Sequence, residues 1–142
     1  MKRTIVAVSL TVAAAIALGS FAIQSVGAAE KEYKSTAKVT ALIQEALPGV
    51  AGKKVIIKRF ELPPGYVGGK HFHPGPVYVY VVEGALTIET EGGGTQTVSA
   101  GGLYKEPLGQ TMRARNLSTN DWTKIVVFQV GDEGKPMMIK AK

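Results

Sequence analysis

The sequence contains no cysteine at any of its 142 positions, and this absence excludes several kinds of chemistry. Without thiols the chain forms no disulfides, uses no thiolate nucleophile and holds no iron–sulfur cluster or cysteine-ligated zinc ion. Histidine is also scarce, since only two are present. A chain of this length has room for one compact domain.

The sequence also lacks the features of nucleic-acid-binding proteins and of several enzyme classes. Its 17 Lys and Arg residues outnumber 11 Asp and Glu residues, but the basic residues are scattered and no aromatic residues are interleaved with them. Nucleic-acid-binding proteins typically carry a dense stripe of basic residues on one element. We therefore expect the scattered lysines to be solvated and expect no nucleic-acid partner. A P-loop, a G-x-S-x-G nucleophile motif and an H-E-x-x-H zinc motif are all absent.

A long hydrophobic run occurs only at the amino terminus. Lys2 and Arg3 precede an uncharged apolar segment, Ile5–Leu18, and small residues at 25–29 precede Glu30. A basic start, an apolar centre and a small-residue exit are the three parts of a secretory signal peptide. An uncleaved membrane anchor is the alternative, because the stretch 5–23 is almost long enough to span a bilayer.

We therefore divide the chain into a signal peptide at 1–29, an amino-terminal leader or arm at 30–52 and a β-barrel domain at 53–142. Export places the protein in the periplasm or outside the cell, and it meets a membrane only through the signal peptide. A chain without cysteine suits such an oxidising compartment.

Short segments rich in β-branched and aromatic residues fill the rest of the chain and predict an all-β fold. Residues 54–62 alternate in part, 77–82 (VYVYVV) are expected to form a strand buried on both faces, and 85–90 alternate clearly. The segment 39–47 fits either a strand or a short helical turn. Glycine or proline interrupts the pattern every eight to twelve residues, which favours a β-sandwich or barrel. Further strands are expected at 95–99, 103–105, 112–115 and 124–130.

The two histidines lie together as His71-Phe72-His73. On a strand, residues two apart point to the same face and their α-carbons lie roughly 7 Å apart. Two imidazoles in this arrangement can approach one metal ion, with metal–nitrogen bonds of about 2.1 Å. The pair alone is equally compatible with a surface position or a polar edge.

The surrounding spacing resembles the cupin family. Gly65, His71, His73 and Gly84 fall on the first cupin motif, G-x5-H-x-H-x3,4-E-x6-G. A second set of residues falls in order on the other motif, G-x5-P-x-G-x2-H-x3-N: Gly101, Pro107, Gly109 and Asn116. The resemblance implies a cupin jelly-roll barrel (a double-stranded β-helix) with a ligand or metal cavity at one mouth.

The resemblance also implies a metal site, from which this sequence departs at two positions. Val77 stands where the family has a glutamate ligand, and Met112 stands where it has a third histidine. Glu106 faces the barrel if the strand before Pro107 keeps its alternation, and Met112 offers a thioether, which favours soft ions. The first hypothesis is therefore a divalent metal (Zn, Ni, Mn, Fe or Cu) held by His71, His73, Glu106 and Met112.

The second hypothesis is a cavity without metal. Val77 and Met112 then make the cavity apolar, and the two histidines serve as hydrogen-bonding or acid–base groups. Cupins include enzymes and non-catalytic binders, so the sequence does not decide between them. Both hypotheses predict a small-molecule ligand or substrate, and open sheet edges predict a homodimer.

We expect the exported protein to have lost its signal peptide by cleavage between Val26 and Glu30, because small residues there fit a signal peptidase. Amino-terminal sequencing of the exported product measures this directly. A product that still begins at Met1 contradicts the prediction.

Overall fold

The computed structural model describes residues 36–142, which form ten β-strands. The chain divides into two units, Met1–Lys31 and Glu32–Lys142, and the described residues all belong to the second. The predicted signal peptide at 1–29 lies outside the described residues. Between residues 36 and 142 the structure holds no helix long and apolar enough to cross a membrane.

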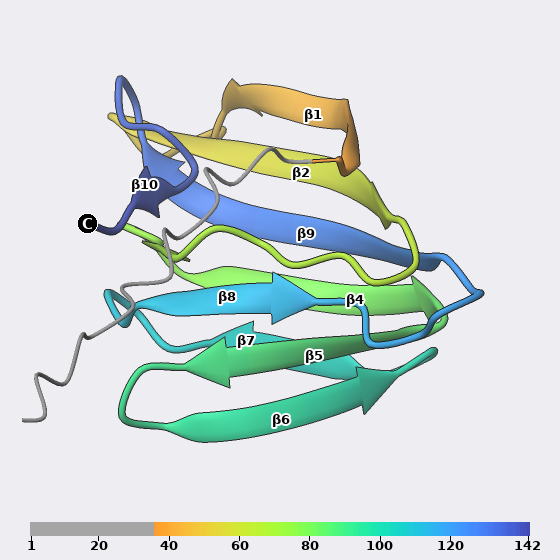
Figure 1. The fold of residues 1–142 in the computed structure, drawn as a ribbon. Helices are drawn as coiled ribbons and strands as arrows, with labels where there is room; N and C mark the ends of the chain where they lie inside the picture. Colours follow the sequence, from red (N-terminus) through yellow and green to blue (C-terminus); the bar gives the residue numbers. More distant parts are fainter. Residues whose placement is uncertain (1–35) are drawn as a thin grey trace, which may run out of the picture. The chain divides into compact units, whose positions relative to one another are not determined.

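The ten strands form two antiparallel sheets of five strands each (Figure 1). The first sheet has the order β1 (Lys38–Ala46), β2 (Lys53–Leu62), β9 (Thr123–Asp132), β4 (Val77–Glu83) and β7 (Leu103–Glu106). The second sheet has the order β10 (Ile139–Lys140), β3 (His71–Phe72), β8 (Met112–Arg115), β5 (Ala85–Thr90) and β6 (Gly94–Ser99).

The predicted all-β jelly-roll fold is confirmed. Alternate residues of both sheets point inward and form one hydrophobic core, as period-two alternation requires. The buried residues of this core are Ile56, Leu62, Val77, Val79, Val81, Leu86, Ile88, Val98, Met112, Ile125, Val127 and Met137.

Strand β4 differs from the sequence prediction of burial on both faces. Val77, Val79 and Val81 point inward and are buried, but Tyr80 and Val82 are about half exposed. The reason is that the outer face of the first sheet carries no second layer from the described residues. The apolar run at 77–82 therefore predicted the strand correctly, but it did not show that only one face of the strand is covered.

The segment 39–47, which fitted a strand or a helical turn, contributes the edge strand β1. It pairs with β2 from Lys38↔Glu61 to Ala46↔Lys54, with a register shift between Ala41 and Ile43. Every residue of β1 is exposed, because the strand lies at the sheet edge. Part of the predicted leader at 30–52 is thus a strand of the first sheet.

All four glycines of the cupin-like motifs, Gly65, Gly84, Gly101 and Gly109, occupy left-handed backbone conformations for which residues with a Cβ are strained. Gly84 has φ +75° and Gly101 has φ +85°. They differ in their surroundings, because a Cβ at Gly84 would lie 2.8 Å from the Trp122 carbonyl oxygen, whereas a Cβ at Gly101 would meet nothing within 4 Å.

We therefore expect Gly84→Ala to destabilise the fold more than Gly101→Ala. The left-handed conformation costs each variant about 1–2 kcal/mol. The clash at Gly84 adds about 1–3 kcal/mol, since backbone atoms cannot move aside as a flexible side chain can. Urea unfolding of both variants measures the difference, and equal losses of stability contradict it.

Candidate functional site

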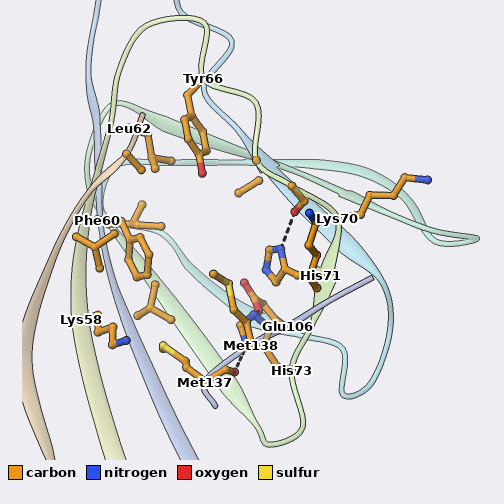
Figure 2. Close-up of a pocket in the computed structure, with 18 of the residues that line it drawn as sticks. Lys58, Phe60, Leu62, Tyr66, Lys70, His71, His73, Glu106, Met137 and Met138 are labelled. Carbon is orange, nitrogen blue, oxygen red and sulfur yellow. Dashed lines mark hydrogen bonds and ion pairs between the residues drawn. The ribbon is translucent and has the colours of Figure 1, made fainter. Parts of the chain in front are cut away.

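A cavity of about 640 Å³ opens between the two sheets. Figure 2 shows His71, His73 and Glu106 on one side of it, with Lys58 and Phe60 across from them. Its wall also includes apolar side chains from both sheets and the carboxy-terminal segment, among them Val39, Leu62, Ile125, Val127, Met137 and Met138. This volume is within the range of cavities that enclose small organic ligands.

The fold brings His71, His73 and Glu106 together, as the sequence predicts. On β7, Glu106 pairs with the inward-facing Val77 and therefore points into the barrel. Nε2 of His73 lies 2.8 Å from Oε2 of Glu106. The rings of the two histidines lie perpendicular, with centroids 5.0 Å apart.

Both histidines are held by backbone carbonyls through Nδ1. The Nδ1 of His71 donates to the Gly69 carbonyl at 2.9 Å, and that of His73 donates to the Met137 carbonyl at 2.7 Å. A carbonyl only accepts hydrogen bonds, so Nδ1 carries the proton in each ring. In the neutral rings Nε2 is therefore the lone-pair nitrogen, and this hydrogen-bonding pattern is common among metal-ligating histidines.

The Glu106 carboxylate has an unsatisfied oxygen. Its Oε2 is buried and receives no aligned hydrogen bond, although His73 lies within ion-pair distance. A neutral His73 presents a lone pair to this oxygen, so the contact is favourable only with a proton or another cation between them. Two donor atoms bound to one ion at a right angle lie about 3 Å apart, close to the observed separation.

These donors fit a divalent metal in chemical type, because two imidazoles and a carboxylate are common ligands of such ions. No group of three or more His, Cys, Asp or Glu side chains in residues 36–142 has the spacing of a metal site as it stands. Binding an ion would therefore require the three side chains to rearrange.

The two histidines have different electrostatic environments. Burial lowers the pKa of His71 below its ordinary value of 6.5, and the hydrogen bond to Gly69 does not offset it. Burial also acts to lower the pKa of His73, but the Glu106 carboxylate and the Met137 carbonyl outweigh it and raise this pKa above 6.5. His73 is therefore the more readily protonated of the pair.

Met112, the fourth predicted ligand, lies next to His71 in the sheet, where the two residues pair directly. Its side chain is only 2% exposed and belongs to the hydrophobic core. It does not contribute to the wall of the cavity, whereas His71, His73 and Glu106 do.

From the sequence, Gln129 fits either a polar group of the pocket or, more commonly for such a residue, an exposed edge position, and nothing points to the segment around Met137. Gln129 points inward from β9 and its Nε2 donates to the Met137 carbonyl at 2.8 Å. That carbonyl also accepts the hydrogen bond from His73. The available signal was that Gln129 is a polar residue within the apolar strand 124–130. Its partner, the Met137 carbonyl, could not be identified because only the fold brings that segment close to β9.

The comparisons with known proteins agree with this architecture. The sequence model of the family described as "Cupin domain" matches residues 58–128, half of the chain. A search among curated proteins finds no match.

Solved structures with the same fold include DMSP lyase DddQ from Ruegeria pomeroyi, with a TM-score of 0.60 at 18% identity over 74% of this chain. This chain spans about half (51%) of the length of that lyase. A conserved double-stranded β-helix protein from Klebsiella pneumoniae matches with a TM-score of 0.55 at 18% identity, over 78% of this chain and 90% of its own. A cupin domain from Bordetella pertussis matches with a TM-score of 0.53 at 24% identity, over 67% and 93%. At these identities the likeness establishes the fold.

We expect the two histidines of the metal-free protein to titrate on opposite sides of 6.5, with His71 below and His73 above. His73 then stabilises the fold at pH values below its unfolded pKa, and this contribution is lost as the pH rises through its folded pKa. In Glu106→Gln the pKa of His73 should fall, because the carboxylate that favours its protonation is gone.

Proton NMR titration measures both pKa values, since the chain has only these two histidines. Glu91→Gln, a change at an exposed residue, is the control and should leave both values unchanged. A pKa of His73 that stays the same in Glu106→Gln contradicts the assigned contact.

Proposed function

The chain belongs to the cupin family, and from this premise we propose that it binds or acts on a small organic molecule through a metal held by His71, His73 and Glu106. The observation that carries the proposal is the convergence of two imidazoles and a carboxylate with an unsatisfied buried oxygen in one cavity. The DMSP lyase with the same fold is a relative with a named small-molecule activity.

The cavity residues have separate roles in this proposal. A divalent metal bound there supplies a Lewis acid for an oxygen atom of the ligand. The carbonyls of Gly69 and Met137 hold the two imidazoles in the orientation that leaves Nε2 as the lone-pair nitrogen. The apolar wall excludes water and contacts the carbon skeleton of the ligand. Met112 lies beside His71 and becomes a fourth donor only if its thioether leaves the core.

A non-catalytic binding protein with a metal-free cavity is the second candidate. It is favoured by Val77, which occupies the glutamate position of the family. It is also favoured by the absence, among residues 36–142, of three His, Cys, Asp or Glu side chains placed to hold an ion. Elemental analysis of the purified protein separates the two candidates. Stoichiometric metal supports the first, and its absence after loading supports the second.

We also propose that the protein is exported to the periplasm or the cell exterior. The support is the basic, apolar and small-residue succession of 1–29 together with the absence of cysteine.

A homodimer is the third part of the proposal. Ile43, Ile57, Phe128 and Tyr78 pair with one another across β1, β2, β9 and β4, so they form an apolar row on the outer face of the first sheet. The described residues provide no layer over this row. A second copy of the chain packed on this face would remove the apolar surface from water.

Metal titration by calorimetry tests the metal site. We expect modest affinity for Zn, Ni, Mn, Fe or Cu that falls as the pH drops, because a ligating imidazole must lose its proton. His71→Ala and His73→Ala should abolish stoichiometric binding, and Glu106→Gln should weaken it at least about tenfold. Met112→His should strengthen binding of Zn, Ni or Mn, because imidazole is the better ligand for these ions.

Glu91→Gln, which changes an exposed carboxylate away from the cavity wall, is the matched control and should bind metal as the wild type does. If Met112 serves only the core, Met112→His lowers the melting temperature without improving affinity. A wild type that takes up none of the five metals refutes the metal site.

For the dimer we expect light scattering to give twice the mass of one chain, and Ile43→Lys to shift the protein toward the monomer. A lysine in the apolar row places a charge in the interface, which would have to be desolvated. Leu117→Lys, at an exposed position outside the row, is the control and should leave the mass unchanged. A monomeric wild type at micromolar concentration contradicts the dimer.

A further inference from the structure

Lys58 occupies an unusual position for a lysine. It lies on β2 directly opposite the inward-facing Val127, and its neighbours on the same face of β2 are the core residue Ile56 and Phe60. Its side chain forms part of the cavity wall and is partly buried. Figure 2 shows its amine turned toward the cavity, across from the histidines and Glu106.

The amine of Lys58 has no hydrogen-bond or ion-pair partner among residues 36–142. The contrast with Lys54, four residues earlier on the same face, is informative. Lys54 donates to the Lys135 carbonyl at 2.8 Å, so the fold supplies its partner. Water reaches a partly exposed ammonium while the cavity is empty. A ligand that excludes this water has to supply an acceptor in its place, and an anion is the strongest one.

The other charges of the cavity act in the same direction. Lys70 and Lys140 lie in its wall and are exposed, and the carboxylate of Glu106 is in contact with His73. The cavity is therefore positive on balance. Walls of low polarity strengthen this field and raise the local concentration of anions.

The rest of the cavity wall is mainly apolar. Phe60, the neighbour of Lys58 on the same face of β2, belongs to it, as do Leu62 and Ile125. A ligand that matches the cavity therefore has an apolar body and an anionic end. One unpartnered ammonium inside the cavity matches a single negative charge better than a double one.

We infer that the ligand of this cavity is a small organic carboxylate, whose apolar body lies against Phe60 and whose carboxylate pairs with Lys58. The inference rests on the proposed binding of a small molecule in the cavity. It adds the chemical class of that molecule and assigns Lys58 as a specificity residue on the side opposite the histidines.

Calorimetry at low salt on the purified, metal-free protein tests the inference with phenylacetate as the probe. Phenylacetate should bind, and the neutral phenylethanol should bind about ten- to a hundredfold more weakly, since it lacks the charge that pairs with Lys58. Lys58→Met should reduce phenylacetate affinity by a similar factor. Lys58→Arg should keep most of it, and Lys105→Met, a change at an exposed outward lysine, should keep all of it.

Thermal unfolding shows that the loss is not a folding defect. Lys58→Met should unfold at the same temperature as the wild type or higher, because methionine suits an apolar wall better than an unpartnered ammonium. A lower unfolding temperature of this variant, with unchanged phenylacetate affinity, assigns Lys58 a structural role and overturns the inference.

Three further results also overturn it: no phenylacetate binding at millimolar concentration, phenylethanol binding as tightly as phenylacetate, or tighter binding of phenyl phosphate. The metal site is judged separately. Lys58→Met should take up metal as the wild type does, because Lys58 is not among the proposed ligands. Metal uptake without phenylacetate binding supports the metal site and overturns the carboxylate inference. Phenylacetate binding without metal uptake supports the carboxylate inference and refutes the metal site.

Discussion

The register of β9 against its two neighbours determines which side chains reach the cavity. Val127 stands opposite Lys58 on one side and Val79 on the other, and Val77 in turn stands opposite Glu106. A slip of one residue between these strands would turn every inward side chain of the shifted strand outward. Lys58 and Glu106 come from strands on opposite sides of β9, so both depend on this pairing, and the buried valines stabilise it.

The carbonyl of Met137 connects this sheet to the histidines. It accepts hydrogen bonds from Gln129 on the first sheet and from His73 near the second. Because it fixes the proton of His73 on Nδ1, it also decides which nitrogen faces Glu106. Nε2 of the neutral His73 therefore carries the lone pair only while the carboxy-terminal segment holds the Met137 carbonyl in this place. Gln129 and His73 are thus connected through this one oxygen.

Much of the fold could be predicted because its signals are local. Neighbouring residues are enough to show the alternation in 85–90, the glycines that end the strands and the spacing of the two motifs. The inward position of Glu106 follows from the alternation of side chains along its strand. The cavity wall could not be predicted in the same way. Lys58 reads as one more basic residue in a charged strand, and Met137 lies far along the chain from the histidines. Their shared location depends on strand pairing between distant segments, which composition and periodicity do not contain.

Met112 shows the limit of motif positions as guides to chemistry. It occupies the place of a family ligand and pairs with His71, yet its side chain fills the core. A thioether is apolar enough to pack in a core and is also a ligand for soft ions. The motif position alone therefore did not distinguish a core role from a ligand role. The surrounding apolar side chains decide its place in this structure.

The two sides of the cavity are unequally secured. Lys58 lies on a strand paired along its whole length, from Lys53↔Asp132 to Leu62↔Thr123. The histidine side depends on β3, which pairs with β8 only at His71↔Met112, and on the equally short β10. Backbone hydrogen bonds from outside these two strands add to this side, among them the Gly68 N–H to the Ala114 carbonyl at 2.8 Å and the Ala141 N–H to the Lys70 carbonyl at 3.0 Å. This side is therefore held by separate bonds and not by one long ladder, and such regions open at lower free energy than long ladders do. Local opening beside the histidines, while the long strands stay paired, would give the proposed ligand a route into the cavity.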